Sequence, residues 1–259
     1  MGAGVTIQSS GPRLAGYVSR VPSAAGSGAP RHGLVLCPGF PATAESAAGE
    51  DDSYPKLADR LAGESRWTVL TFAFRGTGRS EGDFSLGGWI ADLRAAVDFM
   101  LEVEQLSAVW LAGFAAGGAL AICTAAEDER VRGVASLGAP ADFHSWAEHP
   151  ADFLELARHR GVIRDPQFPP DFDAWERELH EIRPLALIGK IPPRPVLVVH
   201  GIDDPEVSPV DARALAEAAE VGEEHVELRL IPGAGSNLRH DPRAVAVLLG
   251  WLDRQSATG

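Results

Sequence analysis

The stretch Gly113-Phe114-Ala115-Ala116-Gly117 is where this chain could hold a reactive side chain on a sharp turn. It follows the apolar run 109–113 and precedes an alanine-rich segment with helical character. Small residues two positions before and after a central residue allow that residue a strained, positive φ between a strand and a helix. The outline is typical of a nucleophile elbow. However, its central residue is Ala115, and a methyl group cannot attack a carbonyl carbon.

The elements that must position this turn follow a regular alternation. Apolar runs predict strands at 34–37, 67–74, 109–113, 131–137, 195–200 and 226–231, after a hairpin at 5–9 and 14–21. Helical spacing predicts helices at 54–62, 86–103, 116–126, 209–220 and 242–254. Such alternation indicates an α/β fold with a mostly parallel central sheet and helices on both faces. The functional site of such a sheet lies at the carboxyl ends of its strands.

Residues 141–190 interrupt the alternation. The segment is rich in aromatic residues, histidine and proline, and we interpret it as a short helical lid inserted into a single domain that spans residues 1–259. Its aromatic side chains either pack the lid onto the body or line a ligand pocket. His144, His149 and His159 are either solvent-exposed or part of that pocket.

With these motifs in place, the chain resembles the α/β-hydrolase superfamily over nearly its whole length. The segment Phe74-Arg75-Gly76-Thr77-Gly78-Arg79-Ser80-Glu81-Gly82 is similar to the family's Arg-Gly-x-Gly-x-Ser-x-Gly turn. Pro38-Gly39-Phe40-Pro41 stands where the family has a His-Gly-Phe turn. The resemblance implies an oxyanion-binding loop at Gly39 and Phe40, with backbone N–H groups of Phe40 and Ala116 as donors. The type most resembled is a small bacterial serine hydrolase of the esterase and peptidase-like branch.

The same resemblance locates the other two members of a catalytic triad. The family's acid follows a late strand as His-Gly-x-x-Asp, which selects Asp204, with Asp203 as the neighbouring alternative. Its base follows the last strand as Pro-Gly-Ala-x-His, and here Ser236 stands at the histidine position. Two of the three triad positions, Ala115 and Ser236, therefore depart from the family, and only Asp204 keeps its residue type.

Two functional classes follow from this degenerate catalytic triad. The first is a pseudoenzyme, a non-hydrolytic member of the fold that binds a small acyl or ester-like ligand in a pocket under the lid or acts through a partner surface. The second is an intracellular hydrolase of esters or other acyl compounds, with a site rewired around His240, Ser236 and Asp204 and with Cys37 as a further candidate. Against the second class, Asp241 and Pro242 look like the N-cap and first residue of the last helix, which leaves His240 on the surface. An engineered exchange would explain Ala115 but not Ser236.

The charge balance of the sequence disfavours some classes of binding partner. The 259 residues carry 36 acidic against 23 basic side chains, a net charge of −13, which disfavours nucleic acid and anionic membrane surfaces. A small-molecule ligand fits this balance, and a homodimer through edge strands or the last helix stays open. No basic segment followed by an apolar run opens the chain, and the two cysteines form no CxxC motif, so we expect a cytoplasmic protein. The arginine- and alanine-rich usage suggests a bacterial source.

The sequence predicts neither a metal nor a cofactor. The eight histidines include no i, i+4 pair beside a carboxylate on a helix. Gly76-x-Gly78 follows a strand, but no helix starts at once and the third glycine of a dinucleotide-binding loop is missing.

Overall fold

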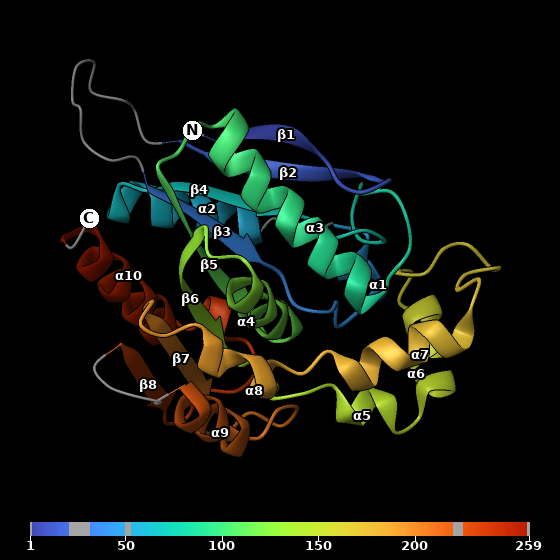
Figure 1. The fold of residues 1–259 in the computed structure, drawn as a ribbon. Helices are drawn as coiled ribbons and strands as arrows, with labels where there is room; N and C mark the ends of the chain where they lie inside the picture. The colour runs from blue at the N-terminus through green and yellow to red at the C-terminus, as the bar shows by residue number, and fades with distance from the viewer. Residues whose placement is uncertain (1, 21–31, 50–52, 220–224, 258–259) are drawn as a thin grey trace.

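An eight-stranded sheet forms the centre of the molecule, in the order β1-β2-β4-β3-β5-β6-β7-β8 (Figure 1). The computed structural model describes residues 2–20, 32–49, 53–219 and 225–257. The strands are β1 Ala3–Gln8, β2 Arg13–Ser19, β3 His32–Cys37, β4 Thr68–Phe72, β5 Ala108–Phe114, β6 Val131–Leu137, β7 Val196–Gly201 and β8 Val226–Ile231. The hairpin β1–β2 joins β4 antiparallel, and all pairs from β4 to β8 are parallel. The predicted fold class is confirmed.

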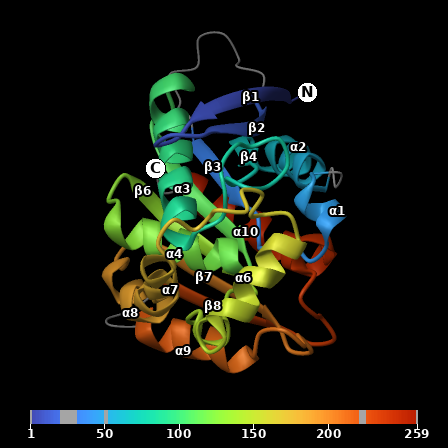
Figure 2. The same cartoon turned by 90° about the vertical axis from the view of Figure 1, so that its right-hand side faces the viewer.

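Helices cover both faces of this sheet (Figures 1 and 2). On one face α2 and α10 pack against each other over one apolar cluster, and α3, α4 and α9 bury a second cluster on the other. Their bounds are α2 Ser53–Ser65, α3 Leu86–Asp98, α4 Ala116–Glu127, α9 Pro209–Ala219 and α10 Pro242–Ala257. Helix α4 is buried all round, since it sits between the sheet and other helices, which explains its uniformly apolar sequence.

Two local features differ from the predicted elements. The predicted helix 86–103 is α3 followed by a π-helical turn at Phe99–Val103, closed by the Glu104 N–H donating to the Phe99 carbonyl at 3.1 Å. The wider turn carries the buried Met100 over Gly33, which has no side chain to block it. The short helix α1, Ala44–Ala47, was not predicted, and Thr43 caps it through a reciprocal bond with Ser46.

The segment 141–190 folds into short helices beyond the carboxyl ends of the strands, with α5, α6 and α7 side by side in Figure 1. They are α5 His144–Ala147, α6 Pro150–His159, α7 Phe172–Glu181, α8 Pro184–Leu187 and the 3₁₀ turn Ile188–Lys190. Among the helices of the described ranges, none combines the length and apolarity that a bilayer crossing requires.

Candidate functional site

Ala115 occupies a strained turn between β5 and α4, with φ 48° and ψ −125°. The glycines around it make this turn possible. A Cβ on Gly113 would overlap the Gly117 carbonyl, and a Cβ on Gly117 would overlap the Pro38 carbonyl and lie 2.5 Å from that of Cys37. Backbone therefore packs directly on backbone where β3, β5 and the start of α4 meet. The turn has the strained strand-to-helix geometry that a nucleophile elbow requires, with alanine at its centre.

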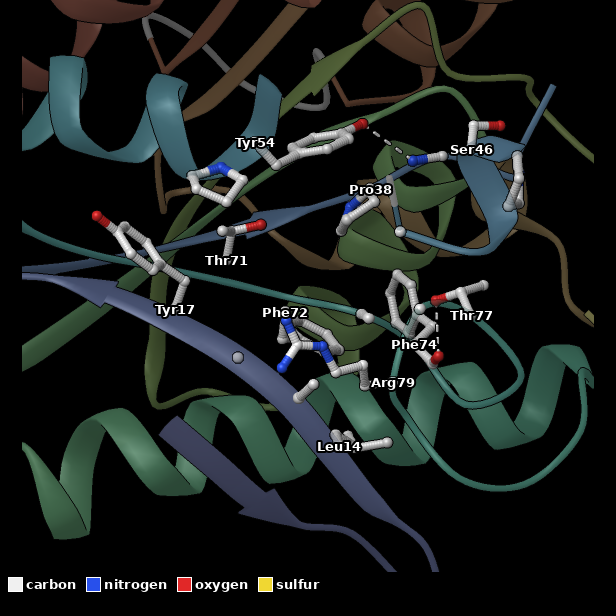
Figure 3. A pocket seen from close by; sticks show the side chains of 18 of the residues that line it. Leu14, Tyr17, Pro38, Ser46, Tyr54, Thr71, Phe72, Phe74, Thr77 and Arg79 are labelled. Atoms are coloured by element: carbon white, nitrogen blue, oxygen red, sulfur yellow. Dashed lines mark hydrogen bonds between the residues drawn. The ribbon is translucent and has the colours of Figure 1, made fainter. Parts of the chain in front are cut away.

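The loop after β3 approaches the same point. A Cβ on Gly39 would lie 3.2 Å from the Ala115 Cβ, so the loop runs closely past the elbow. The Gly39 N–H donates to the Tyr54 hydroxyl at 3.3 Å, shown as a dashed line in Figure 3. Within the described part of the chain, the N–H groups of Phe40 and Ala116 donate to no protein acceptor. Since Ala116 opens α4, the positive end of that helix dipole also faces this region.

The side chain of Asp204 bonds within its own loop, between β7 and α9. Its side chain is 1% exposed, and Oδ1 accepts from the backbone N–H groups of Glu206 at 2.9 Å and Val207 at 3.1 Å. Oδ2 lies 3.8 Å from Nε2 of the fully buried His200, which must donate to the Val207 carbonyl at 3.0 Å because a carbonyl only accepts. The carboxylate thus organises the β7–α9 loop. No hydrogen bond between described residues links it to Ser236.

Ser236 and His240 lie after β8 and do not form a relay with Asp204. Ser236 is partly buried, whereas His240 is exposed on the 3₁₀ turn Leu238–His240. Asp241 accepts the N–H of Arg243 at 2.8 Å at the start of α10, as an N-cap does. Both Ser236 and His240 border a shallow hollow of about 690 Å³. In the described ranges, no hydrogen bond joins the His240 ring to Ser236 or to Asp204.

Aromatic side chains fill the space between the lid and the oxyanion-type loop. Phe40 contacts Phe84, Trp146 and Phe153 with ring centroids 5.2–5.5 Å apart. Trp146 stacks on Phe153 at 4.3 Å, and Trp175 donates its indole N–H to the Phe84 carbonyl at 3.2 Å. The lid aromatics therefore pack the lid onto the body. The lid histidines His144, His149 and His159 are exposed.

Two arginines of the lid fasten it to the body. Arg164 donates to the carbonyls of Gly76 at 2.8 Å and Gly78 at 3.0 Å, and Arg160 donates to the Pro41 carbonyl at 2.6 Å. Gly76 has φ 79°, and a Cβ there would overlap the Val162 carbonyl. The lid thus rests on the glycine-containing turn after β4 and on the loop after β3.

Open space lies elsewhere around Ala115, in a cavity of about 990 Å³ (Figure 3). It extends from Ala115 and Ser236 past the loop after β3 and α1 to the turn after β4 and the β1–β2 hairpin. Sequence reasoning missed this cavity, because its residues come from segments far apart in the chain. Ala115, Ser236, Phe40 and the glycine-rich turn that holds Arg79 are expected from the sequence, whereas Tyr54 is not. None of the described residues of the lid segment 141–190 lines the cavity, so it does not lie under the lid. Of the described residues that line it, none is a histidine or a cysteine.

The two cysteines sit in the core. Burial raises the pKa of the Cys37 thiol far above its usual range, so this thiol is not an ionised nucleophile. Burial and the nearby Glu127 raise the pKa of Cys123 to about 12. Over the described ranges, no three histidine, cysteine, aspartate or glutamate side chains gather as a metal site would need.

A model of the alpha/beta hydrolase family matches residues 34–248, so the chain belongs to that family. No curated protein matches it.

Solved structures with the same fold cover nearly the whole chain. The esterase Pf2001 of Pyrococcus furiosus is 18% identical, with a TM-score of 0.68 over 99% of this chain and 91% of its own. The alpha/beta hydrolase GrgF from Penicillium sp. sh18 is 20% identical, with a TM-score of 0.71 over 99% of both chains. Est1E from Butyrivibrio proteoclasticus, solved with ferulic acid bound, is 19% identical, with a TM-score of 0.69 over 98% of both. At this identity the likeness shows the shared fold.

Proposed function

We propose that this protein is a non-hydrolytic member of the alpha/beta hydrolase family that binds a small acyl or ester-like ligand in the cavity beside Ala115. The observation that carries the proposal is the lining of that cavity. Ala115 and Ser236 border it where the family's nucleophile and base would stand, and no imidazole lines it among the described residues. A hydroxyl is a weak nucleophile until an adjacent base takes its proton.

The fall in turnover that follows when a nucleophile and base are missing argues against ordinary triad hydrolysis. Removing the Ser-His-Asp triad of a serine protease lowers turnover by roughly 10⁶, and binding with an oxyanion hole leaves about 10³–10⁴ over water. The N–H groups of Phe40, which lines the cavity, and of Ala116, which adjoins the lining residue Ala115, have no acceptor among the described residues. They are the part of the machinery that a binding protein could still use. They could donate to a carbonyl oxygen of the ligand without any covalent bond being broken.

The position of His240 argues against the rewired hydrolase. The exposed imidazole has no hydrogen bond to Asp204 or Ser236, and none of the described residues sets its orientation or tautomer. The net charge of −13 further supports a small molecule over nucleic acid as the ligand.

The test is turnover of short activated esters, such as 4-nitrophenyl acetate and butyrate, by four proteins. They are the wild type, Ala115→Ser, Ser236→His and the double variant. We expect the wild type and both single variants at background. The double variant should gain at least about 100-fold, a small part of the roughly 10⁶ that a complete triad supplies. Wild-type turnover well above background that disappears in His240→Ala would instead establish the rewired site.

A further inference from the structure

The cavity beside Ala115 continues as a groove over an uncovered part of the sheet. Gly4 pairs with Tyr17, Thr6 pairs with Ala15, and Tyr17 pairs with Thr71 across β1, β2 and β4, so these side chains share one face. All of them line the cavity. The alternate residues of the same strands, including Ile7, Val18 and Leu70, point into the core under α3.

The floor of the groove is therefore made of mostly small side chains, and its length follows from the sheet. Three strand-to-strand steps separate β2 from β5, and at about 4.8 Å a step they span roughly 14 Å. Tyr17 and Tyr54 stand beside the floor (Figure 3). Their hydroxyls are engaged, since Tyr17 donates to Asp59 at 2.9 Å and Tyr54 accepts from Gly39. Pro38, Phe72 and Phe114 add apolar surface to the lining. The groove therefore suits an extended body with apolar sides.

Some of the charged side chains along the groove have protein partners and others do not. The Nη2 and Nε groups of Arg13 both donate to Oε1 of Glu81, at 2.5 and 3.0 Å. Arg239 lies over the Tyr54 ring, 5.4 Å from its centroid. Arg79 is different, because it makes no hydrogen bond or ion pair with any residue in the described ranges. In Figure 3 its side chain extends from the turn after β4 into the cavity.

Arg79 and Glu206, a cation and an anion of the cavity lining that pair with no described residue, lie toward different strands. Arg79 follows β4, while the exposed Glu206 lies in the loop after β7, and β3, β5 and β6 separate those strands. A guanidinium presents a planar fork that matches a carboxylate with two parallel hydrogen bonds. An elongated acid would place its carboxylate at the β4 end, away from Glu206.

We infer that the ligand is an extended organic monocarboxylate, whose carboxylate pairs with Arg79 and whose apolar body lies along the groove toward Ala115. This inference rests on the proposed ligand-binding function and adds the chemical class of the ligand. The inference makes Arg79 a specificity-determining residue. The resemblance of the turn 74–82 to the family's motif does not by itself assign Arg79 this role.

The experiment compares octanoate with methyl octanoate, two probes with the same chain and different charge. Binding is measured by calorimetry to the wild type, Arg79→Gln and Arg132→Gln. Arg132 is an exposed arginine at the amino end of β6 outside the cavity lining, so its exchange removes an equal charge at a distance. We expect octanoate to bind the wild type more tightly than the ester. Arg79→Gln should weaken octanoate about 2- to 5-fold, as for one exposed ion pair, and leave the ester unchanged. Arg132→Gln should alter neither.

The outcomes separate this inference from the proposed function. Equal binding of both probes, unaffected by Arg79→Gln, would overturn the carboxylate and leave a neutral-ligand site intact. If Arg79→Gln and Arg132→Gln weaken octanoate binding equally, the weakening follows from the lost positive charge alone. That result would overturn a specific pair between Arg79 and the carboxylate. Binding of neither probe by the wild type would overturn the inference, while the ester-turnover comparison would still decide whether the chain is hydrolytic.

Discussion

Ala115 holds a positive φ although its side chain carries no reactive group. In a hydrolase such a conformation lifts the nucleophile clear of the turn, and its cost is of order 1–3 kcal/mol. Here the cost persists, because Gly113, Gly117 and the neighbouring backbone fix the turn around it. The strain is therefore set by the architecture of the turn and not by the residue at its centre.

Ala115→Gly should raise the free energy of unfolding by about 1 kcal/mol. Glycine adopts this φ without strain, and the gain exceeds the roughly 0.5–1 kcal/mol that its extra freedom costs in the unfolded chain. For a chain of this size the melting temperature should rise by about 2–4 °C in calorimetry. The matched control is Ala119→Gly in the body of α4, which should destabilise. A decrease in stability for both variants would contradict strain at position 115.

Strand β3 and helix α4 approach each other closely at a glycine beside the site. The end of β3 and the start of α4 touch at Gly117, where a side chain would collide with two backbone carbonyls. Backbone cannot move aside as the end of a flexible side chain can, so the approach of the loop after β3 to the elbow depends on this residue.

Gly117→Ala should lower the free energy of unfolding by about 3 kcal/mol, the upper range for overpacking a tight site. It should also weaken binding of any cavity ligand, because Gly39 and Phe40 must shift. Gly63→Ala is the control. Gly63 lies exposed in α2, where an added Cβ would meet open space, and alanine there should stabilise by about 0.5–1 kcal/mol. Urea denaturation of both variants tests the pair, and equal effects would refute the steric account.

At the scale of the whole molecule, the body and the lid form one closely packed unit. The lid fills its own interior with stacked rings and bonds to the body through Arg160 and Arg164. Cys37 in β3 and Cys123 in α4 both lie inside the core that this unit encloses. Reagents can reach these thiols only when the core opens.

Both thiols should be unreactive in the native protein. At pH 8, treatment with 5,5′-dithiobis(2-nitrobenzoic acid) should release almost no chromophore, because burial excludes the reagent and the raised pKa values keep both groups protonated. In denaturant both cysteines should react. Rapid native reaction of either thiol would show that its side of the core opens without global unfolding.

Local rules were sufficient for much of this protein. Alternation of apolar runs predicted the sheet and its major helices to within a few residues, because period and strand burial are properties of neighbouring residues. The glycines at 113 and 117 predicted the elbow, because small residues two positions before and after the central residue are a local pattern, although Gly117 is also required by the distant backbone of Cys37 and Pro38. The short helix α1 and the π-helical turn were missed, because they depend on a cap and on packing against Gly33.

The sequence by itself thus determined the fold family and the residue types at the elbow and after the last strand. The tertiary structure decided what surrounds them. It packed Phe40 against the lid residue Trp146 and opened a groove at Arg79, whereas the exposure of His240 was already expected from the Asp241-Pro242 helix start. These outcomes depend on contacts between segments many residues apart, whose mutual approach is set by the packing of the whole sheet and its helices.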